Sequence, residues 1–181
     1  MPTDKIRCFD YLVYRIVTKG MDETPSVQQI KESGRLKMFN KLKLLKLLFF
    51  VATIKHEDDD LLCVFSDFYA MPYGPVESDV YNGLSEMPHF VFEGNALNIR
   101  GEVSDFNFTD ICPTIINKID NAISALEAKN SKIFSMPTFD LVELSHKALA
   151  WKTIFESALR SGCQSKKMPV ELLKETTIFY N

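Results

Sequence analysis

The chain has 181 residues and a formal net charge of −3, and 46% of its residues are hydrophobic and 25% charged. These values are typical of a globular protein whose length suits one domain with a packed core. A negative net charge gives no overall attraction for nucleic acid, so binding to nucleic acid would require a local basic surface.

The N-terminal part predicts two helices with an irregular segment between them. Apolar residues recur at helical spacing over residues 4–18, and Gly20 ends this helix. Residues 20–37 are polar, although Ser26 with Gln29 three positions later suits the start of a short helical turn. Residues 38–55 predict a helix that is apolar nearly all round in its second half, so it should be the buried central element.

Short aromatic segments and turns follow the central helix. Residues 61–65 and 68–71 are apolar runs that favour strands. Gly74 precedes a proline and must be extended or turned, and Pro75 suits the first position of a helix that continues to about residue 84. Residues 90–92 and 97–99 flank Gly94-Asn95, which predicts a hairpin.

The C-terminal part is helical. Residues 113–129 carry one continuous apolar stripe, and Thr138 suits the cap of a helix through about residue 147. Further helices are predicted over residues 151–161, which Gly162 ends, and over residues 169–175. The expected fold is mainly α (α+β): a compact helical domain around a central apolar helix, with a small antiparallel β element.

The chain offers no pattern of an enzyme or a metal protein. Its four cysteines are widely spaced and no signal peptide precedes them, which predicts reduced thiols and a cytoplasmic location. The apolar run over residues 42–54 is too short to cross a bilayer. We expect no catalytic residue, no cofactor and no metal site. The cysteines are Cys8, Cys63, Cys112 and Cys163.

Two groups of residues leave metal binding as a minor alternative. Residues 56–60 form an acidic run whose carboxylates suit a hard cation, but the run lacks the spaced ligands of a calcium loop and is more typical of a solvated turn. The three histidines, His56, His89 and His146, have no zinc-ligand spacing.

Three segments together resemble a known family. They are the Lys-Leu helix over residues 43–50, the Tyr73-Gly74-Pro75-Val76 turn, and His146 preceded by Leu141 or Val142 and followed by Trp151. This pattern resembles the Panacea domain, the SocA-like antitoxin family of bacteria and their mobile elements. Residues 19–37, a probable insertion, and residues 85–110, a variable region, match the pattern poorly; the expected domain spans residues 1–181.

The resemblance implies a non-enzymatic antitoxin. Such a protein binds and neutralises a cognate protein toxin, either directly or as an adaptor that delivers the toxin to an ATP-dependent protease. Two alternatives stay open: an accessory protein of a phage or mobile element that binds a host protein, and, with less support, a DNA-binding regulator. The resemblance also gives Gly74, Pro75, Val76, His146 and Trp151 a structural role.

A partner site is expected near the turn. Lys43 and Lys46 are three residues apart on one side of the central helix, where lysines should reach solvent over apolar neighbours. We hypothesise that Lys43, Lys46 and Tyr73 border this site. His146 is interpreted as an interface donor or, with more support, as a partly buried side chain bonded to a backbone carbonyl beside Trp151.

A local basic cluster has three interpretations. It consists of Arg35, Lys37 and Lys41 together with Lys43 and Lys46. It is a solvated helix end, a contact for an acidic partner surface, or a contact for nucleic acid; the net charge disfavours the last.

Overall fold

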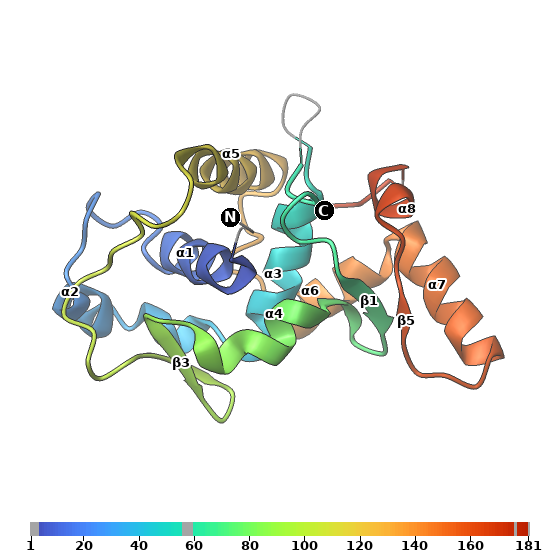
Figure 1. The fold of residues 1–181 in the computed structure, drawn as a ribbon, viewed down its shortest axis with the longest axis horizontal. Coiled ribbons are helices and arrows are strands. Elements are labelled where there is room, and N and C mark those ends of the chain that lie inside the picture. The colour runs from blue at the N-terminus through green and yellow to red at the C-terminus, as the bar shows by residue number, and fades with distance from the viewer. Residues whose placement is uncertain (1–3, 56–59, 176, 181) are drawn as a thin grey trace.

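The computed structural model describes residues 4–55, 60–175 and 177–180. It is mainly helical with small antiparallel sheets, which confirms the predicted fold class. Figure 1 shows α3 (Lys41–Thr53) near the centre, between α1 (Lys5–Val17) and α2 (Val27–Glu32) on the left and α7 (Leu149–Arg160) and α8 (Val170–Glu175) on the right. No helix in the described part of the chain is long and apolar enough to cross a membrane.

The first and central helices form where the apolar pattern predicts them. The Asp4 carboxylate accepts from the backbone amides of Ile6 and Arg7 and so caps α1. Eleven residues of α3 are buried, and α3 contacts α1, β2, α5 and α6, so it is the central helix. The predicted start at residue 38 was wrong. Residues Arg35–Met38 form the separate 3-10 helix η1, and Asn40 caps α3 after the extended Phe39.

The remaining helices agree with the predictions except at their ends. Ser26 and Gln29 form the predicted capping box of α2, and α5 (Pro113–Lys129) has the predicted bounds. Thr138 does not cap α6 (Thr138–His146), because Pro137 occupies the cap position and the Thr138 hydroxyl accepts from the amide of Asn40.

Two small antiparallel sheets complete the fold. The first has the order β2 (Gly74–Glu77), β1 (Phe68–Met71), β5 (Lys166–Lys167), and β5 was not predicted. The second pairs β3 (Phe90–Glu93) with β4 (Ala96–Ile99) around the predicted Gly94-Asn95 turn, where Gly94 has a φ of 62°.

Two predictions around the first sheet were wrong. Residues 61–65 form a helical turn, in which the amides of Val64 and Phe65 both donate to the Leu61 carbonyl. The helix expected from Pro75 starts later, as α4 (Ser78–Gly83), and the 3-10 helix η2 (Leu84–Glu86) follows it. The reason is Glu77, whose carboxylate accepts from the Val80 amide and so fixes the helix start three residues beyond Pro75.

Candidate functional site

Lys46 is buried beneath the β1–β2 turn. Its side chain is inaccessible to solvent, and its Nζ donates to the Pro75 carbonyl oxygen at 2.5 Å. Burial lowers the pKa of the Lys46 ammonium to about 7. The expectation that Lys46 reaches solvent was therefore wrong, because an acceptor 29 positions later in the chain meets the amine inside the protein.

Lys43 is also buried, contrary to the prediction. Only 4% of the residue is exposed, and its Nζ lies 5.1 Å from the centre of the Phe39 ring. Burial lowers the pKa of Lys43 as well. An aromatic face stabilises the cation in place of solvent.

Gly74 has a conformation and an environment that require glycine. Its φ is +91°, in the region that side chains with a Cβ rarely adopt. A Cβ at this position would lie 2.3 Å from the Ser145 Oγ and 3.2 Å from the Lys46 Nζ. Ser145 is itself buried and donates to the Val142 carbonyl, so it cannot move aside without losing that bond. The turn therefore lies directly against α3 and α6.

His146 and Trp151 hold the other side of the same turn. Their rings stack with centroids 3.9 Å apart and an angle of 10° between the planes. The Trp151 Nε1 donates to the Met71 carbonyl at 3.0 Å. His146 has a hydrogen bond to the backbone of Pro72, and the carbonyl must be its acceptor because proline has no N–H. This arrangement agrees with the second interpretation of His146, a side chain bonded to a backbone carbonyl beside Trp151.

The His146 ring is in an electropositive and partly dry environment. Burial, followed by the charge of nearby Lys46, lowers the pKa of His146. Its Nε2 is buried and has no hydrogen-bond partner among the described residues. A neutral imidazole suits this position better than an imidazolium, because a second cation beside Lys46 would be repelled.

The three family-like segments therefore meet around one hairpin turn, and we call this group the motif cluster. It brings α3, the β1–β2 hairpin, α6 and α7 together through side chains far apart in the sequence. Its members are Lys46, Gly74, Pro75, Ser145, His146 and Trp151. Val76 is buried beside the cluster and pairs with Tyr69 of β1.

Tyr73 is presented outward by the motif cluster. It is one of the two residues between β1 and β2, and 60% of it is exposed. Leu149, three residues beyond His146 in the chain, is 62% exposed. Of the three residues in the partner-site hypothesis, Tyr73 alone has an exposed side chain. Lys43 and Lys46 lie below the surface.

Glu77 and Ser145 were missed as site residues. The fully buried Glu77 carboxylate accepts from the backbone amides of Val80 and Asp67 and from the Lys5 ammonium at 2.7 Å. It fixes the strand-to-helix junction after the turn. An acidic residue just after the Gly-Pro-Val sequence was the available sign.

A buried aspartate–histidine pair was missed as well. The His89 Nδ1 lies 2.6 Å from the Asp10 carboxylate, and the Asn107 amide donates to the His89 Nε2. Because Nε2 accepts, Nδ1 carries the proton and donates to Asp10. Both ring nitrogens are engaged, so the pair anchors the loop at Asn107 to α1. Its one sign in the sequence was a carboxylate within the apolar pattern of the first helix.

The predicted basic cluster does not form one surface. Arg35 donates to backbone carbonyls of Val17 and Lys19, and the Lys41 Nζ lies 5.8 Å from the centre of the Phe92 ring. With Lys43 and Lys46 buried, Lys37 is its one exposed lysine. A contact for nucleic acid needs several exposed cations on one surface, so the arrangement disfavours that interpretation.

The candidate metal ligands are dispersed or lie outside the described residues. Residues 56–59 of the acidic run are not described. Among the residues that are, no three His, Cys, Asp or Glu side chains are grouped as metal ligands would be. The four cysteines are free, and Cys8 is the buried one.

Comparison with known proteins identifies one family. The family model described as antitoxin SocA-like, Panacea domain, matches residues 44–152. No curated protein and no solved structure matches the chain. The matched segment contains every member of the motif cluster and covers more than half of the 181 residues. The chain therefore belongs to the SocA-like antitoxin family defined by the Panacea domain.

Proposed function

We propose that this chain is an antitoxin that binds and neutralises a protein toxin encoded beside it. The observation that carries the proposal is the family match over residues 44–152, since a SocA-like antitoxin implies a toxin as partner. The family is generally non-enzymatic, so neutralisation depends on contact with the toxin and not on chemistry. We place this activity in the cytoplasm.

The geometry supports the β1–β2 turn as part of the toxin-binding surface. Lys46, Gly74 and Trp151 hold the turn in one conformation, so Tyr73 is presented on a rigid support. A tyrosine combines a large apolar ring with a polar tip and loses little conformational entropy when it is covered. Tyr73 is therefore the proposed contact, and Lys46 contributes by supporting the turn from below.

Growth rescue tests the proposal most simply. The product of each gene that flanks this one is expressed from an inducible promoter, and growth is followed with and without this chain. The proposal expects one product to arrest growth and this chain to restore it and co-purify with that product. A flanking product that arrests growth, is not rescued and forms no complex contradicts the proposal.

The same experiment separates the two routes of neutralisation. Direct binding leaves the toxin at full abundance in a stable complex. An adaptor lowers the abundance of the toxin. When the ATP-dependent proteases of the host are deleted one at a time, the abundance of the toxin is then restored in one of the deletion strains. The half-life of the toxin after translation is stopped is the quantity to measure.

A further inference from the structure

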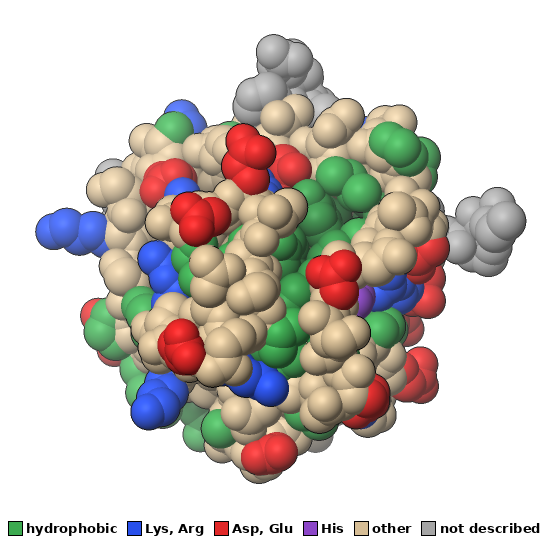
Figure 2. Space-filling model, turned by 90° about the vertical axis from the view of Figure 1, so that its left-hand side faces the viewer, with side chains coloured by type: hydrophobic (Ala, Val, Ile, Leu, Met, Phe, Trp, Pro, Cys, Tyr) green, Lys and Arg blue, Asp and Glu red, His purple; other side chains and the backbone are tan. Residues whose placement is uncertain are grey.

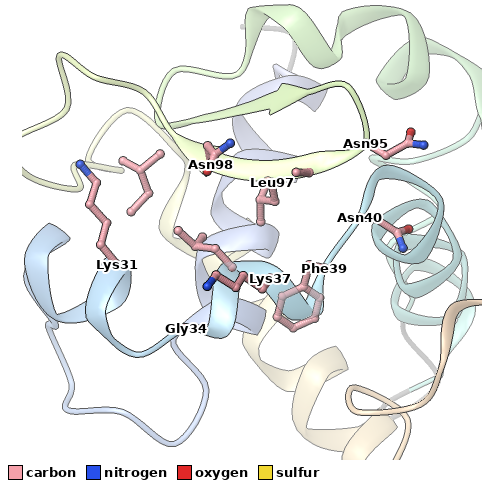
Figure 3. Close-up of a pocket in the computed structure, with 11 residues that line it drawn as sticks. Lys31, Gly34, Lys37, Phe39, Asn40, Asn95, Leu97 and Asn98 are labelled. Carbon is pink, nitrogen blue, oxygen red and sulfur yellow. The ribbon is translucent and has the colours of Figure 1, made fainter.

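A second surface with the features of a binding site lies apart from the motif cluster. Figure 2 shows the left-hand side of the molecule, where hydrophobic side chains lie in a hollow and both acidic and basic side chains surround it. On the side of α2, a groove of about 650 Å³ runs between η1 and β4 (Figure 3). We call it the η1–β4 groove. It is lined by Lys31, Leu36, Lys37, Phe39, Asn40 and residues 95–99, with Gly34 at the turn.

The floor of the η1–β4 groove is apolar. Leu36 and Phe39 contribute from one wall, and Leu97 and Ile99 contribute from the other. Figure 3 shows Leu97 pointing from β4 toward the wall that carries Phe39 and Lys37. A concave apolar floor with a few polar groups at its edge is typical of a binding site.

The charged residues that line the groove are both lysines. Lys31 and Lys37 are exposed, and no acidic residue lines the groove. Within the described ranges neither lysine has an ion-pair partner, whereas Lys5 and Lys19 each pair with a carboxylate. Unpaired cations beside an apolar floor complement a ligand that carries both carboxylates and apolar groups.

The shape of the groove suits an extended chain. Five consecutive residues, 95–99, line one wall, and at about 3.3 Å per residue they extend over roughly 13 Å. β3 pairs with one side of β4, and on the other side the described residues form one bridge, from Asn40 to Ala96. A peptide in extended form fits along this wall and places alternate side chains on the floor and toward the lysines.

We propose that the η1–β4 groove binds an extended acidic segment of the partner protein. Its apolar side chains contact Leu36, Leu97 and Ile99, and its carboxylates pair with Lys31 and Lys37. The identity of the partner as a toxin rests on the proposed function, but the chemistry of the segment rests on the groove. One wall, residues 31–40, precedes the family match, so the groove gives this chain a means of choosing its partner outside the shared motif.

A peptide titration tests the groove without the toxin. The probe is a capped peptide of about seven residues with alternating Asp and Leu, long enough to extend beyond the five-residue wall. The control probe has Lys in place of Asp. Both are titrated into the ¹⁵N-labelled chain, and amide chemical shifts are recorded. We expect the acidic peptide to shift the amides of residues 36–39 and 95–99 and the basic peptide to leave them unchanged.

Charge reversal supplies the matched variants. Lys31→Glu with Lys37→Glu is expected to weaken binding of the acidic peptide by about tenfold or more and to create binding of the basic one. Lys129→Glu with Lys174→Glu reverses the charge of two exposed lysines elsewhere and should change the binding of neither peptide. Equal binding of both peptides, or shifts confined to other surfaces, overturns the proposal. The proposal is also overturned if the wild-type chain forms a dimer that Lys31→Glu with Lys37→Glu dissociates, because a second copy of the chain then covers the groove.

The toxin from the growth assay separates the two proposals. If the flanking product binds the wild-type chain, the groove reversal should lower its association rate and weaken the salt dependence of that rate. A reversal that leaves both unchanged overturns the groove proposal alone. If no flanking product binds the wild-type chain but the acidic peptide still binds the groove, the proposed function fails and the groove proposal stands.

Discussion

The Nζ of Lys46 lies 2.5 Å from the carbonyl oxygen of Pro75, and this bond joins the central helix to the turn that carries Tyr73. A lysine in the interior is costly unless its amine is neutral or well bonded. Burial lowers the pKa of Lys46 to about 7, and the Pro75 carbonyl oxygen accepts a hydrogen bond from its amine. The motif lysine therefore acts as an internal support for the turn.

Stability should rise with pH because of Lys46. Its folded pKa of about 7 is below the ordinary value of 10.5, so the unfolded state binds more protons between these values. The free energy of unfolding should therefore increase above pH 7, by up to about 1.4 kcal/mol per pH unit, and this gain is absent below pH 7. Urea denaturation between about pH 7 and 8.5 measures the slope.

The upper limit of this pH range and two variants separate the contribution of Lys46 to the slope from the contributions of other groups. Burial raises the pKa of the Cys8 thiol to about 12, which gives the opposite slope above its ordinary value of 9.0. Below that value, Lys46→Met should remove most of the slope. Lys152→Met, at an exposed position, should retain the slope. An unchanged slope in Lys46→Met would show that this amine is protonated in the folded protein.

Gly74→Ala should destabilise the protein for two separate reasons. A φ of +91° strains any residue with a Cβ, and the new Cβ would overlap the Ser145 Oγ. The expected loss is about 1–3 kcal/mol from the backbone and more from the overlap. Adding Ser145→Ala should recover part of the loss by removing the Oγ. Gly101→Ala is the control, since its Cβ meets nothing within 4 Å. Equal midpoints for the three variants in urea would contradict this account of the turn.

Trp151→Phe should separate ring stacking from hydrogen bonding. A phenylalanine retains a ring beside His146 but leaves the Met71 carbonyl without the indole N–H. The expected cost is about 1 kcal/mol from the lost hydrogen bond, plus a contribution from the smaller ring. Thermal denaturation followed by circular dichroism gives the value. A variant as stable as the parent would mean that the indole bond to β1 contributes nothing to the turn.

The whole chain should unfold in one transition. Buried residues from α1 through α8 belong to one hydrophobic cluster, so residues 1–181 are expected to behave as a single domain. Far-ultraviolet circular dichroism and tyrosine–tryptophan fluorescence should give the same midpoint. Two separate midpoints would divide the chain into independent units.

The sequence predicted the parts of the structure that depend on local periodicity. The apolar stripe over residues 113–129 and the all-round apolar pattern of the central helix each have one stable solution, a helix with that face buried. The capping box formed by Ser26 and Gln29 was equally predictable, because it depends on residues three positions apart. The family motif also predicted the turn at Gly74, because the need for glycine there comes from the backbone conformation of that residue.

What could not be predicted depends on contacts between distant segments. In the sequence, Lys46 is a charged residue on a helix, so it was expected to reach solvent. Its hydrogen-bond acceptor, the Pro75 carbonyl, comes close to it only in the folded protein. Glu77 caps a helix that the Gly-Pro sequence alone would start earlier. The two-residue β5 has no pattern of its own and exists because β1 offers an open edge. The η1–β4 groove joins segments about sixty positions apart, so no local pattern describes it.

The affinity of the growth-arresting flanking product for the Tyr73→Ala variant shows whether the β1–β2 turn binds the toxin. Tyr73 is 60% exposed and Tyr81 is 49% exposed, so Tyr81→Ala is a matched control of the same residue type. Both variants should fold like the parent, and Tyr73→Ala alone should weaken the complex, by about tenfold or more, mainly through faster dissociation. A Tyr73→Ala protein that binds as tightly as the parent and still rescues growth would contradict the claim that the turn held by the motif cluster binds the toxin.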